Sequence, residues 1–230
     1  MSWATALVAA LLCGAAGSFV PALVGRLPGP EYAAVAARPG LARTSALVSA
    51  LAGGLAGLVV GWAWVLPAVL LVVPVGVALA LVDLHTRLLP KALVLPLTGA
   101  VAVLLLLAAG LERDPAALVR AAVGLAAART LYGLLWRVRS SGMGFGDVRL
   151  AAPLGAVLGY LGWAELVVGL WSGFLVFGLP GLVLALVRRD REMLRTAYPF
   201  GPAMLAGALI GLLVGAPLLG ALIGDGLVAG

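Results

Sequence analysis

Long apolar runs dominate the chain, and charged residues or Pro and Gly breaks separate them. The runs fall at approximately 4–25, 44–62, 65–83, 92–110, 116–136, 148–163, 165–187 and 200–223. A helix that crosses a bilayer core of about 30 Å uses roughly 20 apolar residues. The pattern therefore predicts an all-α integral membrane protein, a bundle of about eight transmembrane helices.

The overall composition leaves little room for a water-soluble domain. Of 230 residues, 63% are hydrophobic and only 10% are charged, whereas a soluble fold needs a polar exterior. Eight crossings would occupy about 160 residues and leave only short connections. We therefore expect a single polytopic membrane domain over residues 1–230.

The basic residues follow every second run, which predicts the orientation of the chain. Twelve of the 15 lie in these connections: Arg26, Arg38, Arg43, Arg87, Lys91, Arg137, Arg139, Arg149, Arg188, Arg189, Arg191 and Arg195. Basic residues beside apolar spans favour the cytoplasmic side and contacts with anionic lipid. Both termini are then predicted outside. We expect membrane lipid, and not nucleic acid, to account for the formal charge of +6.

Two runs carry glycines at a spacing of four residues, which favours close helix packing in lipid. These glycines are Gly53, Gly57 and Gly61 in the second run and Gly207, Gly211 and Gly215 in the eighth. Packing is the simpler interpretation of both faces. They would also suit a helix that slides or opens for a substrate.

Two aspartates lie at the ends of apolar runs. Asp83 ends the third run and Asp147 opens the sixth, 64 residues later. Two crossings lie between them, so both are predicted at the cytoplasmic face. Because an ionisable residue at membrane depth is costly, each is a functional candidate.

A pair of carboxylates in one site suits peptide hydrolysis without a metal or a cofactor. The pair holds one proton, so the ionised member can take a proton from water while the protonated member polarises a peptide carbonyl. A purely structural interpretation is also open, because Asp147 could cap a helix and Asp83 could pair with Arg87. Gly144 and Gly146 favour the functional one, since glycines allow a substrate strand to approach closely.

Several separated segments resemble the bacterial type IV prepilin peptidases, membrane aspartic peptidases with a Gly-x-Gly-Asp motif. They are 83–90 (Asp-Leu-His-Thr-Arg-Leu-Leu-Pro), 144–150 (Gly-Phe-Gly-Asp-Val-Arg-Leu), 199–202 (Pro-Phe-Gly-Pro), and the pair 17–19 (Gly-Ser-Phe) and 26–28 (Arg-Leu-Pro). Presenilin-like intramembrane proteases share the Gly-x-Gly-Asp motif. The 17–19 and 26–28 elements favour the prepilin branch.

The resemblance implies a function and a set of site residues. Asp83 and Asp147 would form the catalytic pair, with Gly144 and Gly146 positioning the backbone. The reaction would remove a short basic leader from prepilins and pilin-like secretion proteins at the cytoplasmic face of a bacterial plasma membrane. The peptidase core would cover about 65–223. Residues expected near the substrate are Arg87, Pro90, Arg149, Pro199, Phe200, Gly201 and Pro202.

One segment departs from the family pattern. Typical bacterial relatives insert a cytoplasmic domain with paired cysteines between the first two spans, a region linked to zinc and to N-methylation. Here the stretch 26–43 has 18 residues and no cysteine, as expected for a shortened cytoplasmic loop. We expect peptidase activity without zinc, and the short loop argues against N-methyltransferase activity. Arg149 also stands where many relatives carry lysine, which keeps the charge but changes its geometry.

Two other functions compete with this interpretation. An inactive relative could serve as a pilus or secretion assembly factor, with both aspartates acting only as helix caps. A proton-coupled transporter would also use membrane carboxylates, but it predicts carboxylates near the midplane and repeated halves of the chain. The sequence shows neither of these features.

Overall fold

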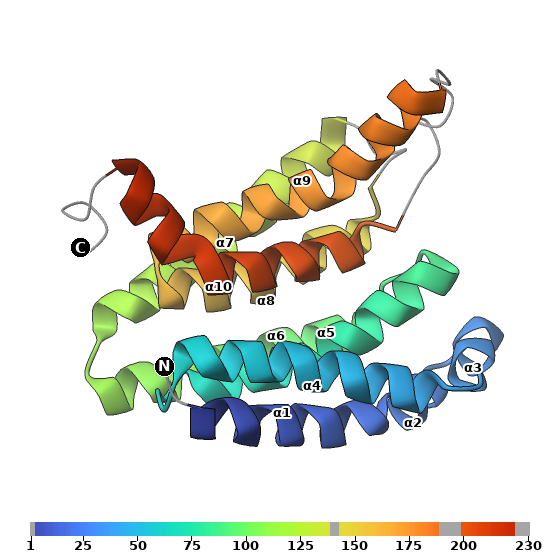
Figure 1. Cartoon of the computed structure of the whole chain (residues 1–230), viewed down its shortest axis with the longest axis horizontal. Helices are drawn as coiled ribbons and strands as arrows, with labels where there is room; N and C mark the ends of the chain where they lie inside the picture. Colours follow the sequence, from blue (N-terminus) through green and yellow to red (C-terminus); the bar gives the residue numbers. More distant parts are fainter. Residues whose placement is uncertain (1–2, 139–142, 189–198, 224–230) are drawn as a thin grey trace.

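The structure is a computed structural model that describes residues 3–138, 143–188 and 199–223, and all regular structure in these ranges is α-helical (Figure 1). The prediction of an all-α protein is confirmed. The helices are α1 Trp3–Ser18, α2 Val20–Gly25, α3 Pro30–Ala36, α4 Leu41–Val60, α5 Leu66–Thr86, α6 Lys91–Glu112, α7 Pro115–Val138, α8 Phe145–Leu161, α9 Trp163–Arg188 and α10 Gly201–Ile223.

Six stretches among the described residues are long and apolar enough to cross a membrane. They are Trp3–Gly25 (α1 with α2), α4, α5, α6, α7 and the Gly201–Leu218 part of α10. The predicted runs 148–163 and 165–187 correspond to α8, which has 17 residues, and to α9. The chain is thus a multi-pass membrane protein. The count of eight spans and the outward termini stay predictions.

The helices form two layers (Figure 1). Helices α1, α4, α5 and α6 make up one, called here the N-terminal layer, and α7 to α10 make up the other, the C-terminal layer. The most extensive helix contacts join α1 to α4, α7 to α8 and α9 to α10, all within a layer. Contacts between layers are fewer and are led by α6 with α8 and α5 with α10.

Two of the three glycines in the predicted packing face of α4 contact a neighbouring helix, which is α1. A Cβ atom added to Gly53 would lie 2.6 Å from the Cβ of Cys13, and one added to Gly57 would lie 2.6 Å from the Cβ of Ala9. Gly61 differs, because it ends the helix with a φ of 66° and an added Cβ would meet nothing within 4 Å. Its role is to stop α4, which only a glycine does without strain at this φ.

The glycine face of α10 packs against α9. A Cβ on Gly207 would lie 2.7 Å from the carbonyl oxygen of Gly169, and one on Gly215 would lie 2.7 Å from the Cα of Glu165. Since backbone atoms occupy the space that a side chain would need, the two helices approach as closely as small residues permit. The packing interpretation of both glycine faces is therefore confirmed, except at Gly61.

The stretch 26–43 is more structured than the shortened loop that we predicted. It contains α3 and the start of α4. Tyr32, Val35 and Leu41 are buried and belong to a small apolar cluster with Ala78 and Val82 of α5. Burial of apolar side chains thus holds this connection against the end of α5 that carries Asp83.

A polar network joins the two layers at the end of the bundle opposite Asp83. The Glu112 carboxylate accepts hydrogen bonds from the Tyr160 hydroxyl, at 2.7 Å, and from the Trp64 backbone N–H, at 3.0 Å. Asp114 accepts a hydrogen bond from the Ala117 N–H at the start of α7. These contacts satisfy polar groups that would otherwise be costly at the edge of an apolar bundle.

Candidate active site

Asp83 lies in the last turn of α5 and is only 4% exposed. The helix ends just beyond it, where Arg87 adopts a left-handed conformation with a φ of 56° and donates its backbone N–H to the Asp83 carbonyl. The ring of His85 and the hydroxyl of Thr86 bond back to carbonyls of the same helix. Among these polar residues, Asp83 is the buried one.

Asp147 lies in the first turn of α8 and is equally buried, at 4% exposure. Its Oδ2 accepts a hydrogen bond from the Gly144 N–H at 2.9 Å, so the carboxylate caps its own helix. A negative charge is favourable at a helix N-terminus. The capping interpretation is therefore correct, and it does not exclude a chemical role for the other oxygen.

A backbone amide from the opposite layer binds Asp83. The Gly201 N–H, at the start of α10, donates a hydrogen bond of 2.9 Å to Asp83 Oδ2. A Cβ on Gly201 would lie 2.9 Å from the same oxygen, so a side chain at this position would crowd the carboxylate. The alternative partner, Arg87, is exposed, and no ion pair joins it to Asp83 in the part of the chain that the structure describes.

The two aspartates lie on neighbouring helices, close enough for their carboxylates to interact. Helices α5 and α8 are in contact, and the two carboxylates interact electrostatically. Each carboxylate receives one backbone N–H on Oδ2, and each Oδ1 has no hydrogen-bond partner within the described ranges. Two oxygens are thus available for a water molecule, a shared proton or a substrate carbonyl.

Aromatic rings hold the 199–202 segment beside this pair. Phe200 is buried, and its ring centroid lies 4.7 Å from that of Phe177 and 5.6 Å from that of Phe174, both on α9. Burial of Phe200 fixes the chain just before Gly201. The segment that resembles the family element therefore supplies the amide for Asp83.

Tyr132 of α7 is a site neighbour that the sequence analysis did not identify. It is 1% exposed, stacks on Phe174 at 5.1 Å between ring centroids, and contacts Phe200 at 5.8 Å. Its hydroxyl interacts electrostatically with Asp147. The available signal was a polar hydroxyl within a predicted span, which is costly unless it has a partner.

The remaining predicted residues divide between the site and its surroundings. Arg149 places its guanidinium 4.7 Å from the ring centroid of Phe145, a cation–π contact on its own helix. Pro90 precedes α6, and Pro202 lies in the first turn of α10. Pro199 precedes the buried Phe200 in a short non-helical stretch. The structure therefore brings Gly201 to Asp83 but leaves Arg87 exposed.

Gly146, directly before Asp147, packs against Leu89 in the connection that follows α5. We expect Gly146→Ala to impair the site. The added Cβ would lie 2.6 Å from the Cβ of Leu89, an atom fixed to the backbone, so the start of α8 must move. Such overpacking costs about 1–3 kcal/mol. The rate of peptide hydrolysis by the purified variant should fall about ten-fold or more below that of the unmodified protein.

Gly144→Ala is the matched control for this prediction. Its φ is −77°, and its nearest non-adjacent atom would be 3.6 Å from the added Cβ, an ordinary contact. It should therefore keep most of the activity. Equal losses in the two variants would contradict the role of close contact at Leu89.

Comparison with known proteins gives a consistent set of relatives. A family model described as the type IV leader peptidase family matches residues 70–224, a range that includes both aspartates and the 199–202 segment. Proteins named prepilin leader peptidase/N-methyltransferase are similar to the chain. The Aeromonas salmonicida relative is 34% identical over 197 residues, which covers 84% of this chain and 63% of the relative.

Two further relatives carry the same name. The Aeromonas hydrophila protein is 35% identical over 156 residues, or 66% of this chain and 51% of the relative. The Pseudomonas aeruginosa protein is 33% identical over 175 residues, or 74% of this chain and 57% of the relative. The matched part of the chain thus spans about half to five-eighths of these relatives. No solved structure matches the chain significantly.

Proposed function

Because the chain belongs to the type IV leader peptidase family, we propose that it is a membrane-embedded aspartic endopeptidase that removes the short basic leader from type IV prepilins and pilin-like secretion proteins. The observation that carries this proposal is the pair of buried, electrostatically interacting carboxylates of Asp83 and Asp147. Family membership alone would also fit an inactive relative, whereas a buried acidic pair has a direct use in hydrolysis.

The proposed reaction uses the two carboxylates with one proton between them. The ionised carboxylate takes a proton from a water molecule, and the water oxygen attacks the carbonyl carbon of the scissile peptide bond. The protonated carboxylate donates a hydrogen bond to the carbonyl oxygen. Transfer of a proton to the amide nitrogen then releases the new amino terminus and the leader carboxylate.

The backbone amides of Gly144 and Gly201 orient this chemistry. Each binds one Oδ2, so each carboxyl group is held with an Oδ1 that has no hydrogen-bond partner among the described residues. Fixed orientation lowers the entropic cost of reaching the reactive geometry. Phe200, which packs against Tyr132 and directly precedes Gly201, supports the Gly201 amide from the aromatic cluster in the C-terminal layer.

The proposed site faces the cytoplasm. The end of α5 and the start of α8 lie at the same end of the bundle, and the nearby basic residues Arg87, Lys91 and Arg149 satisfy the positive-inside rule. A leader that carries basic residues would stay on this side of the membrane for the same reason. We place the protein in the bacterial plasma membrane.

We propose cleavage without N-methylation. The names of the relatives combine a leader peptidase with an N-methyltransferase, but the stretch 26–43 of this chain has no cysteine and forms α3 instead of a larger domain. The mass of the cleaved product distinguishes a free amino terminus from a methylated one.

The test is co-expression of the chain with a prepilin and, separately, of the prepilin alone. We expect a mass decrease that depends on the chain, and N-terminal sequencing should find the new amino terminus at the start of an apolar segment. An uncleaved prepilin beside well-inserted protein, across several prepilins and pseudopilins, would contradict the proposed activity.

A further inference from the structure

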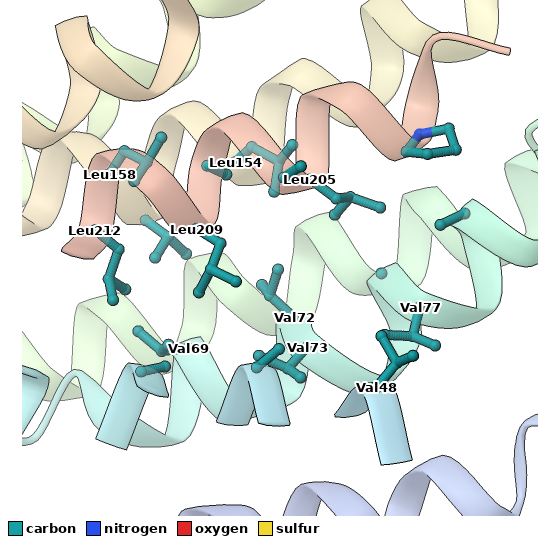
Figure 2. Close-up of a pocket in the computed structure, with 18 residues that line it drawn as sticks. Val48, Val69, Val72, Val73, Val77, Leu154, Leu158, Leu205, Leu209 and Leu212 are labelled. Atoms are coloured by element: carbon teal, nitrogen blue, oxygen red, sulfur yellow. The ribbon is translucent and has the colours of Figure 1, made fainter. Parts of the chain in front are cut away.

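An apolar cavity of ≈ 350 Å³ lies between the two layers. Helices α4 and α5 line it from the N-terminal layer, and α8 and α10 line it from the C-terminal layer. Figure 2 shows Val72 of α5 and Leu209 of α10 pointing toward each other across this space. Its volume is within the range of natural ligand sites.

One end of the cavity lies next to the aspartate site. Ala80 lines the cavity and precedes Asp83 by less than one helical turn, while Pro202 lines it directly after Gly201. On α5, the lining residues extend from Val69 to Ala80, about 16 Å along the helix axis. The cavity thus extends along α5 from a point less than one turn before Asp83 toward the opposite end of the helix.

The walls of the cavity suit a helix. Ala52 and Ala56 of α4, and Gly76 and Ala80 of α5, line it in pairs spaced four residues apart. Small residues at this spacing allow helix backbones to approach closely in lipid. Within each layer, comparable glycine faces are filled by a neighbouring helix, whereas this surface borders the cavity between the layers and meets the opposite layer at Gly76, where an added Cβ would lie 2.7 Å from the Leu205 side chain.

All the residues that line the cavity are apolar or glycine, so it has no side chain that would orient a polar ligand. A peptide with its scissile bond at Asp83 and Asp147 would meet this apolar space next to Ala80 and Pro202. At membrane depth, a peptide satisfies its own backbone groups only by forming a helix. Continuity with the carboxylates therefore favours a peptide helix over an acyl chain.

We propose that this cavity, the interlayer groove, binds one face of an apolar helix of the substrate that begins just beyond the scissile bond. The proposal rests on the proposed function and adds the place where the substrate is recognised. A length of about 16 Å corresponds to about 11 helical residues. Side chains on one face of the substrate helix enter the groove. The two layers of the protein contact the rest of the substrate helix.

Photo-crosslinking tests the location. A photoreactive residue replaces Leu209 or Val77 in the groove, or Leu51 on the exposed face of α4, in the Asp147→Asn background. Each protein is co-expressed with a prepilin, irradiated and analysed by mass spectrometry. We expect groove positions to crosslink to the first dozen or so residues of the prepilin helix, and Leu51 to crosslink to lipid.

Filling the groove is an independent test. Ala52→Phe places a ring in the space from mid-α4, away from the carboxylates, and Leu51→Phe is the lipid-facing control. We expect kcat/KM for a full-length prepilin to fall about ten-fold or more in Ala52→Phe and to stay near the wild-type value in Leu51→Phe. Both proteins should unfold at temperatures close to that of the wild type.

The outcomes separate the groove from the proposed function. Groove crosslinks to lipid alone, or an unchanged kcat/KM in Ala52→Phe, would overturn the groove assignment while wild-type cleavage still supports the peptidase. Absence of wild-type cleavage in the same assay would overturn the proposed function instead. If Ala52→Phe is unstable, the crosslinking result alone decides whether the groove binds the substrate helix.

Discussion

Asp83→Asn and Asp147→Asn should each reduce prepilin cleavage by at least about 100-fold, because an amide neither takes a proton from water nor donates one as a carboxylic acid does. Asn keeps the shape of the side chain, and its carbonyl oxygen can still accept the N–H of Gly201 or Gly144. The variants should therefore insert and fold. Processing is measured from the mass of the co-expressed prepilin.

Asp114→Asn is the matched control. Like the two site aspartates, Asp114 accepts a backbone N–H near the start of a helix. Its Oδ2 also lies 3.7 Å from Nη2 of Arg120. It differs in being at the opposite end of the bundle. Its replacement should leave cleavage nearly unchanged. Full activity in either Asp83→Asn or Asp147→Asn would remove the acid–base role and leave capping as the sole function of that residue.

Gly155→Ala should destabilise the protein by about 2 kcal/mol or more. Helices α7 and α8 approach so closely that an added Cβ at Gly155 would overlap the Gly124 carbonyl oxygen and lie 2.6 Å from the Cβ of Ala128. A backbone atom cannot rotate away as a side chain can. Because α8 carries Asp147 and α7 carries Tyr132, activity should fall with stability.

The measurement is the unfolding temperature of the purified protein in detergent. Gly110→Ala is the control, since an added Cβ at this α6 position would meet nothing within 4 Å. It should leave the unfolding temperature unchanged or slightly higher, because alanine favours a helix over glycine. Similar losses in both variants would show that the α7–α8 contact does not limit stability.

Much of the architecture could be predicted from the sequence, because its causes are local. Each apolar run had to satisfy its own backbone hydrogen bonds, and in lipid a helix does so within one segment. The predicted runs accordingly lie within a few residues of the observed helices, as 65–83 does for α5 Leu66–Thr86. A count of crossings then placed Asp83 and Asp147 at one end of the bundle without any knowledge of packing.

Local pattern failed where the structure of a segment depends on whether a distant residue packs against it. The stretch 26–43 has the Pro, Gly and charge content of a loop, yet Tyr32 and Val35 find apolar partners on α5 and form part of a packed cluster. Gly61 shares the spacing of a packing face but ends a helix. A period of four residues does not reveal which glycine has a neighbour.

The sequence by itself determined the class of protein, the positions of the helices and the common face of the two aspartates, since hydropathy and helix length act within each segment. Only the tertiary structure decided that Gly201 binds Asp83 across 118 residues, that Tyr132 interacts electrostatically with Asp147, and that a groove opens between the layers. These features depend on how whole helices pack against one another. A spacing of small residues marks a face that can pack closely in lipid, but the partner of that face is set by shape complementarity between distant segments.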